Sequence, residues 1–168
     1  MTAANPAPSA TSEPVRQLLR HTLATLAYRG SKAMRGAPKE FSSFSCGSGC
    51  RSAGQILAHI ADLLGWGLSM AQGNGEWNAS NPQSWTDDVK RFHAGLAAFD
   101  TYLASDKPLH SPIEKLFQGP IADALTHVGQ IAVLRRLAGS PVKGENYFVA
   151  DITVGRVGAD QAAPNFEF

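Results

Sequence analysis

Apolar residues recur in alternating steps of three and four along several stretches of the chain, and this spacing limits the fold most strongly. Residues spaced in this way lie on one face of an α-helix, because one turn takes 3.6 residues. In the clearest stretch, residues 86–104, the stripe consists of Val89, Phe92, Leu96, Phe99 and Leu103. Such a stripe packs against other helices, as in a helix bundle. The pattern therefore predicts an all-α fold.

Three further helices are predicted at residues 14–35, 52–72 and 120–138. The first begins at Pro14, a residue favoured in a first helical turn, and the last ends at Gly139. A short helical piece is expected at 112–117. Residues 142–168 contain several glycines and no helical period, so we expect an irregular C-terminal tail packed on the helices.

The segment between the second and third predicted helices, residues 73–84, contains Gly, Asn and Pro and has no apolar period. Twelve extended residues span about 40 Å, whereas a 20-residue helix is about 30 Å long. This linker can therefore cross the whole molecule and leave the two helices parallel. We expect one domain over residues 14–168, a four-helix bundle with up-down-down-up topology, after a disordered leader at 1–13.

Charge and composition exclude some classes of function. The 168 residues carry a net charge of +1, from 15 basic and 14 acidic residues, and no basic block stands out. Nucleic acid is therefore not the expected partner, because phosphate binding needs clustered positive charge. No apolar run approaches the roughly 20 residues of a membrane span. Residues 1–14 do not resemble an export signal, so we expect a cytoplasmic protein.

Two cysteines, Cys46 and Cys50, lie in the sequence Cys-Gly-Ser-Gly-Cys. In the cytoplasm we expect them to be reduced thiols. They could form a redox pair or half of a zinc site, but three residues separate them and no second cysteine pair completes a zinc cage. We favour the interpretation that they are incidental residues of a turn, and expect that replacing both with Ser leaves stability and metal content unchanged.

Three residues form a candidate site for a divalent metal. Asp123 and His127 are four residues apart on one predicted helix, which places them on the same face. His59 lies on the core-facing stripe of another predicted helix, among Ile56 and Leu63. Two imidazoles and one carboxylate suit Zn, Ni, Fe or Mn and leave positions open for water or substrate. The alternatives are a hydrogen-bonded core histidine and a simple Asp–His pair on a helix surface.

Three neighbouring residues have weaker assignments. Asp62 lies one turn from His59 and could orient its ring, although we favour a solvated carboxylate. Trp66 shares the His59 stripe and could line a pocket, although core packing is the favoured interpretation. Gln130 follows His127 by one turn and either faces a pocket mouth or makes a helix-cap or tail contact. The remaining histidines, His21, His93 and His110, have no partner at a useful spacing, and we expect them to be incidental.

Two of these segments resemble motifs of the DinB/YfiT-like metalloprotein superfamily. Residues 55–62 read Gln-Ile-Leu-Ala-His-Ile-Ala-Asp and resemble its second helix. Residues 123–131 read Asp-Ala-Leu-Thr-His-Val-Gly-Gln-Ile and resemble its fourth-helix motif, which ends His-x-Gly-Gln. The resemblance covers roughly residues 15–139, and the tail phrase at 144–156 resembles a bacterial subgroup.

The resemblance implies an up-down-down-up bundle with three metal ligands, usually all histidine. His59 and His127 match the first and last ligands, and Asp123 stands at the middle position. It also implies a metal-dependent transferase or hydrolase, in which the metal activates a low-molecular-weight thiol or water towards a small-molecule substrate. No protein nucleophile or general base is assigned. The alternative is a non-catalytic bundle that binds a ligand or forms a homodimer and retains a vestigial metal site.

Overall fold

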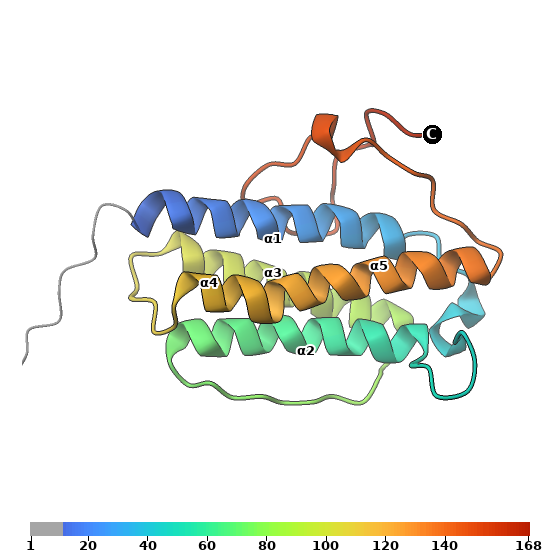
Figure 1. Cartoon of the computed structure of the whole chain (residues 1–168), viewed down its shortest axis with the longest axis horizontal. Coiled ribbons are helices and arrows are strands. Elements are labelled where there is room, and N and C mark those ends of the chain that lie inside the picture. The colour runs from blue at the N-terminus through green and yellow to red at the C-terminus, as the bar shows by residue number, and fades with distance from the viewer. Residues whose placement is uncertain (1–11) are drawn as a thin grey trace, which may run out of the picture.

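The computed structural model describes residues 12–168 (Figure 1). The leader expected at residues 1–13 lies outside the described residues except for its last two, Ser12 and Glu13, which belong to the first helix. Apart from one isolated bridge in the tail, regular structure in the described range is helical. The all-helical class is therefore confirmed. The four long helices are α1 (Ser12–Met34), α2 (Ala53–Gln72), α3 (Trp85–Ala104) and α5 (Ala122–Leu137).

The apolar stripes meet where the long helices pack against each other. Helix α1 contacts α3 and α5, and α2 contacts the same two helices. The predicted stripe of α3 is buried from Phe92 to Leu103, and only Val89 at its start is half-buried. The largest completely buried side chains come from α1, α2, α3 and the connecting segments: Phe41, Phe92, Phe99, Leu23, Leu26, Leu57, Ile60, Leu64, Leu96, Leu103, Leu116 and Ile121.

Helix boundaries follow ordinary capping chemistry. Ser52 precedes α2 and exchanges hydrogen bonds with Gln55 in a capping box, which satisfies two backbone N–H groups of the first turn. Gly73 ends α2 in the left-handed conformation that glycine adopts without steric cost. Ser84 caps α3 by accepting a hydrogen bond from the Asp87 backbone. These caps fix both ends of the 73–84 linker.

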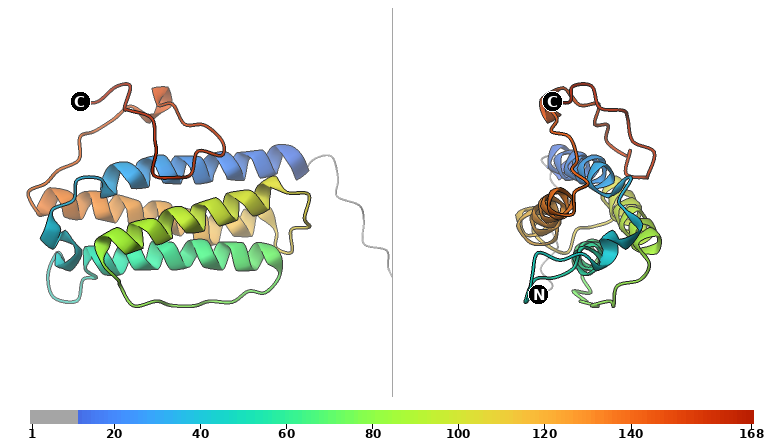
Figure 2. Two further views of the ribbon diagram at one scale, coloured as in Figure 1. Left: turned by 180° about the vertical axis from the view of Figure 1, so that it is seen from behind. Right: turned by 90° about the vertical axis from the view of Figure 1, so that its right-hand side faces the viewer.

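The linker passes along α2 from its last turn back to the level of its first (Figures 1 and 2). Helix α3 starts there, so α2 and α3 run in the same direction. The linker is exposed but held at Ser80, whose backbone N–H and hydroxyl both donate hydrogen bonds to the Asp62 carboxylate on α2, at 2.8 and 2.7 Å. Residues 73–84 therefore form a strap across one face of α2.

The last long helix begins differently from the prediction. Instead of starting at Pro120, it continues from the short helix α4 (Ile113–Leu116) through a π-helical turn, η2 (Phe117–Ile121), into α5. The proline has no N–H and does not fit the interior of an α-helix, and the wider turn accommodates it. This turn packs on α2 at Gly67, where a Cβ atom would lie 2.7 Å from Phe99 and 3.1 Å from Pro120.

The tail after α5 is irregular, as expected, and lies against α1 (Figure 2). It contains the short 3₁₀ helix η3 (Tyr147–Val149) and the bridge between Glu145 and Glu167. The completely buried Glu145 carboxylate accepts hydrogen bonds from Tyr28 and Lys32 of α1, both at 2.6 Å. Within residues 12–168, none of the helices combines the length and apolar character that crossing a membrane requires.

Candidate metal centre

His59 reaches the candidate centre from the middle of α2. Its neighbours along the helix, Ala58 and Ile60, are buried, and its own side chain is 21% exposed. The imidazole forms no hydrogen bond with any residue of the described chain, and its Nε2 lies 3.7 Å from the Asp123 carboxylate across the helix interface. A largely buried ring with free nitrogens is available to bind a ligand.

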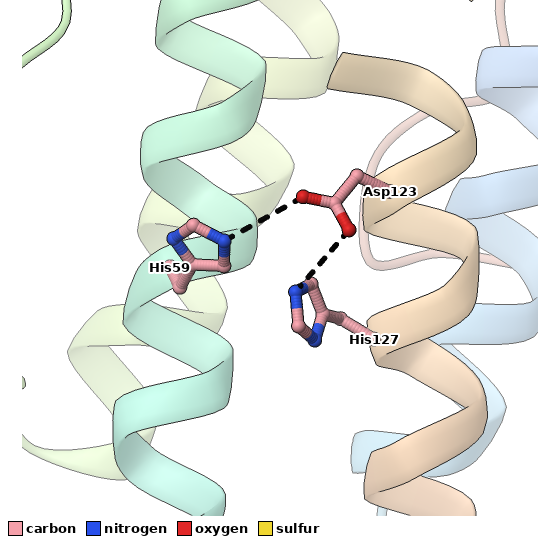
Figure 3. Close-up of side chains that lie close together, drawn as sticks. All are labelled: His59, Asp123 and His127. Atoms are coloured by element: carbon pink, nitrogen blue, oxygen red, sulfur yellow. Dashed lines mark ion pairs between the residues drawn. The ribbon is translucent and has the colours of Figure 1, made fainter. Parts of the chain in front are cut away.

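Asp123 and His127 lie one turn apart near the start of α5, on the face that meets α2. The Asp123 carboxylate is 46% exposed and the His127 side chain 12% exposed, so the carboxylate lies nearer the solvent. One carboxylate oxygen is 3.4 Å from His127 Nε2 and the other is 3.7 Å from His59 Nε2. Figure 3 shows both rings directed at this carboxylate. The three predicted ligands are therefore brought together.

The spacing of these atoms suits a shared cation. One ligand atom from each residue can be chosen so that all three lie within 4.8 Å of one another. Ligands bound about 2.1 Å from a tetrahedral ion lie about 3.4 Å apart. The separations of 3.4 and 3.7 Å between the histidines and the two oxygens of Asp123 are close to this value. Nitrogen and carboxylate donors are also the set that Zn and similar divalent ions prefer.

Gln130 orients the His127 ring. Its side-chain Oε1 lies 2.8 Å from His127 Nδ1, which makes Nδ1 the protonated nitrogen and leaves the lone pair of Nε2 directed at the centre. A hydrogen bond to the remote nitrogen of a metal-binding histidine serves this purpose in many metal sites. Sequence predicts either a pocket-mouth position or a helix-cap or tail contact for Gln130, and its three-residue spacing from His127 also allows this hydrogen bond.

Burial lowers the pKa of His59 below its ordinary value of 6.5, and the positive charges of His127 and Arg51 act in the same direction. The negative charges of Asp123 and Asp62 oppose them. The net effect keeps the His59 imidazole neutral at pH 7, and the neutral ring is the form that binds a metal.

Two tryptophans form a wall beside His59. Trp77 of the linker meets the His59 ring edge-to-face at 5.6 Å between centroids, and it contacts Trp66 of α2 in the same manner at 5.8 Å. Trp66 is half-buried and packs against the hydrophobic core, as predicted, and it also lines a surface hollow. Trp77 could not be found from sequence, because the linker has no period that would place it next to α2.

Asp62 has a different role from either one expected. The side chain is buried, not solvated, and its hydrogen bonds go to Ser80 and to Arg91 of α3, the latter at 2.7 Å, rather than to His59. Arg91 also binds the buried carboxylate of Asp88 at 2.7 Å. Asp62 therefore holds the linker in place, and it affects the metal centre only through Trp77 of that linker.

Cys46 and Cys50 form a disulfide in the loop before α2, so the expectation of reduced thiols is wrong for this structure. Gly47 and Gly49 both have positive φ, and the Cys50 N–H donates a hydrogen bond to the Gly47 carbonyl. This tight turn brings the two Cα atoms to 6.0 Å, within bridging range. The spacing in the sequence did not reveal the pairing because it depends on two left-handed glycines.

Searches of protein-family models, curated proteins and solved structures found no match to this chain.

Proposed function

We propose that this chain is a DinB-like metal-binding protein that acts as a metal-dependent transferase or hydrolase. In this proposal His59, Asp123 and His127 hold one divalent ion, Zn, Ni, Fe or Mn. The described helices form an up-down-down-up four-helix bundle around it. The substrate is a small molecule and the second reactant is a low-molecular-weight thiol or water. The cytoplasm remains the proposed location, although disulfides such as Cys46–Cys50 are rare in reducing compartments.

The convergence of three donor side chains from two helices carries the proposal. His59 comes from α2 and the other two come from α5, yet their ligand atoms lie within 4.8 Å of one another. The Gln130 contact adds support, because it fixes the His127 tautomer that a metal requires.

A divalent ion at this centre would act as a Lewis acid. It would lower the pKa of a bound thiol or water, so that the nucleophilic form is available at neutral pH. The protein residues have separate roles around it. His59 and His127 would each hold the ion through a ring nitrogen, and Asp123 would balance part of its positive charge from the solvent side. Trp77 covers the His59 edge and limits access of bulk water there. No side chain is assigned as nucleophile, because the thiol or water fills that role.

The second candidate is a non-catalytic bundle with a vestigial site. The observation in its favour is Asp123 itself, which replaces the histidine usual in the superfamily and is nearly half exposed. A carboxylate between two imidazoles is also a stable arrangement without metal when either ring is protonated. Dimerisation or ligand binding would then be the function.

Metal analysis of the purified protein tests the proposal. Wild type supplied with Zn, Ni, Fe or Mn and then desalted should retain about one ion per chain, whereas His127→Ala and Asp123→Ala should retain far less. His21→Ala, which removes an exposed histidine of α1, is the matched control and should bind as wild type does. Failure of wild type to hold any of the four metals would exclude both the centre and the enzyme.

Turnover separates the two candidates once metal binding is established. The metal-loaded protein should accelerate loss of a low-molecular-weight thiol in the presence of an electrophile, or hydrolysis of an activated ester or amide. His127→Ala should abolish the acceleration. Stoichiometric metal without any such activity across both classes would favour the non-catalytic bundle.

A further inference from the structure

A groove of about 740 Å³ lies next to the metal centre, between α5, the first turn of α2 and the disulfide loop. Sites for small ligands commonly have volumes of roughly 300–1,000 Å³ and mostly apolar walls with a few polar groups. The proposed reaction does not account for this groove.

The walls of the groove are mainly apolar. Val133 and Leu137 of α5 line one side and are 52% and 59% exposed. Ile56 of α2 and the Cys46–Cys50 disulfide contribute to the opposite side. An apolar ligand body would cover these surfaces and gain the free energy of their removal from water.

Arg51 is the one lining residue of this groove with a fixed charge. Within residues 12–168, no carboxylate forms an ion pair with its guanidinium. Arg51 also borders the hollow lined by His59 and Trp77, so it lies between that hollow and the groove. A guanidinium presents paired donors that match a carboxylate.

We propose that the groove binds a small monocarboxylic acid with an apolar body, whose carboxylate pairs with Arg51 and whose body covers Ile56, Val133 and Leu137. His127 lines the same groove, so a ligand held there lies beside the metal centre. That this acid is the substrate rests on the proposed function, whereas its binding does not.

Substitution of Gly129 tests whether the groove binds a ligand. It lies on α5 among the lining residues, and a Cβ atom built there would meet no other atom within 4 Å. A leucine at this position would extend into the groove without displacing protein atoms. It would also favour the helix, since glycine is less favourable than leucine in a helix interior. Loss of binding in this variant would therefore not reflect unfolding.

The test measures binding of octanoate to metal-free protein by titration calorimetry, with octyltrimethylammonium as a probe of equal chain length and opposite charge. Octanoate should bind at least about tenfold more tightly than the cation. Gly129→Leu should weaken octanoate binding by about tenfold or more without lowering the melting temperature. Gly65→Leu is the matched control, because Gly65 of α2 also has no atom within 4 Å of a Cβ and does not line the groove.

Arg51→Met retains much of the apolar stem and removes the charge. It should remove the preference for octanoate over octyltrimethylammonium. Equal binding of octanoate to wild type and Gly129→Leu would overturn the proposal, as would a wild-type protein that binds both probes equally. A wild-type dimer that Gly129→Leu dissociates, with no octanoate binding, would assign the groove to a second copy of the chain. Because the probes are added without metal, loss of octanoate binding and loss of metal binding are separate results.

Discussion

At the scale of single residues, the candidate centre depends on how each polar atom is directed. His127 uses one ring nitrogen for Gln130 and presents the other to Asp123. Asp123 in turn presents one oxygen to each histidine. Two imidazoles and a carboxylate arranged in this way need little movement to bind an ion, which limits the entropy lost on binding.

Replacing Gln130 should weaken metal binding without removing a ligand. In Gln130→Ala the His127 ring loses the contact that fixes its tautomer, and we expect the metal dissociation constant to rise about 10- to 100-fold, the usual effect of losing such a partner. Competition with a chromophoric chelator measures this change. Gln118→Ala, which alters an exposed glutamine of η2, should leave the constant unchanged. An unchanged constant in Gln130→Ala would mean that the hydrogen bond does not orient His127.

Sequence reasoning found the three ligand candidates because helical spacing alone places them. A step of four puts Asp123 and His127 on one face, and the α2 stripe turns His59 inwards. It could not find Trp77 or the role of Asp62, because both depend on where an aperiodic linker lies in space. Nor could spacing show that Cys46 and Cys50 pair.

At the scale of helices and linkers, one ionic cluster fastens the 73–84 strap. Arg91 of α3 binds the carboxylates of Asp62 and Asp88, whose side chains are almost completely buried. Asp62 also holds Ser80 of the strap. The cluster therefore connects α2, α3 and the segment that positions Trp77 against His59.

Removing Arg91 should destabilise the fold through the carboxylates left behind. Breaking a fully buried ion pair costs about 3–5 kcal/mol. Because the Arg91 side chain remains partly exposed, we expect Arg91→Met to lower the free energy of unfolding by about 2 kcal/mol, as measured in urea. The neighbouring pair of Lys90 and Asp87 is exposed, so Lys90→Met should cost less than about 0.5 kcal/mol. Similar losses in both variants would contradict a special role for the cluster.

The ends of the helices were predicted correctly for α2 and α3 but not for the start of α5. The ends of α2 and α3 lie within about one residue of the prediction, because Ser52, Gly73 and Ser84 carry recognisable capping chemistry. The predicted start of the last helix at Pro120 was wrong. Proline normally marks a helix start, but here Pro120 lies inside a π-helical turn that continues into α5.

At the scale of the whole molecule, the tail closes over α1 and α3 through polar contacts. His93 of α3, expected to be incidental, has its Nδ1 3.2 Å from the Val157 carbonyl of the tail and its Nε2 3.5 Å from the Ser31 hydroxyl of α1. Val157 itself is buried. The histidine therefore joins three parts of the chain.

This contact predicts a loss of stability in mild acid. Burial lowers the pKa of His93 below 6.5, and the hydrogen bond to Val157 only partly offsets this. The unfolded chain therefore binds more protons than the folded chain as the pH falls through about 6.5, and the contribution of His93 to stability declines. Between pH 7.5 and 5.5 the melting temperature of wild type should fall further than that of His93→Gln, which can still donate to Val157 but does not titrate. Parallel curves for the two proteins would contradict the prediction.

The pairing of the helices has a consequence for how the chain is made. The principal contacts of α1 and α2 are with α3 and α5, which lie beyond the linker, rather than with each other. The first half of the protein therefore has no substantial helical partner of its own. A ribosome adds roughly 5–20 residues per second, so the 32 residues between the ends of α2 and α3, from 72 to 104, take about 2–6 s. During that interval α2 lacks both of its principal helical partners, α3 and α5, so its apolar face is uncovered and exposed to aggregation.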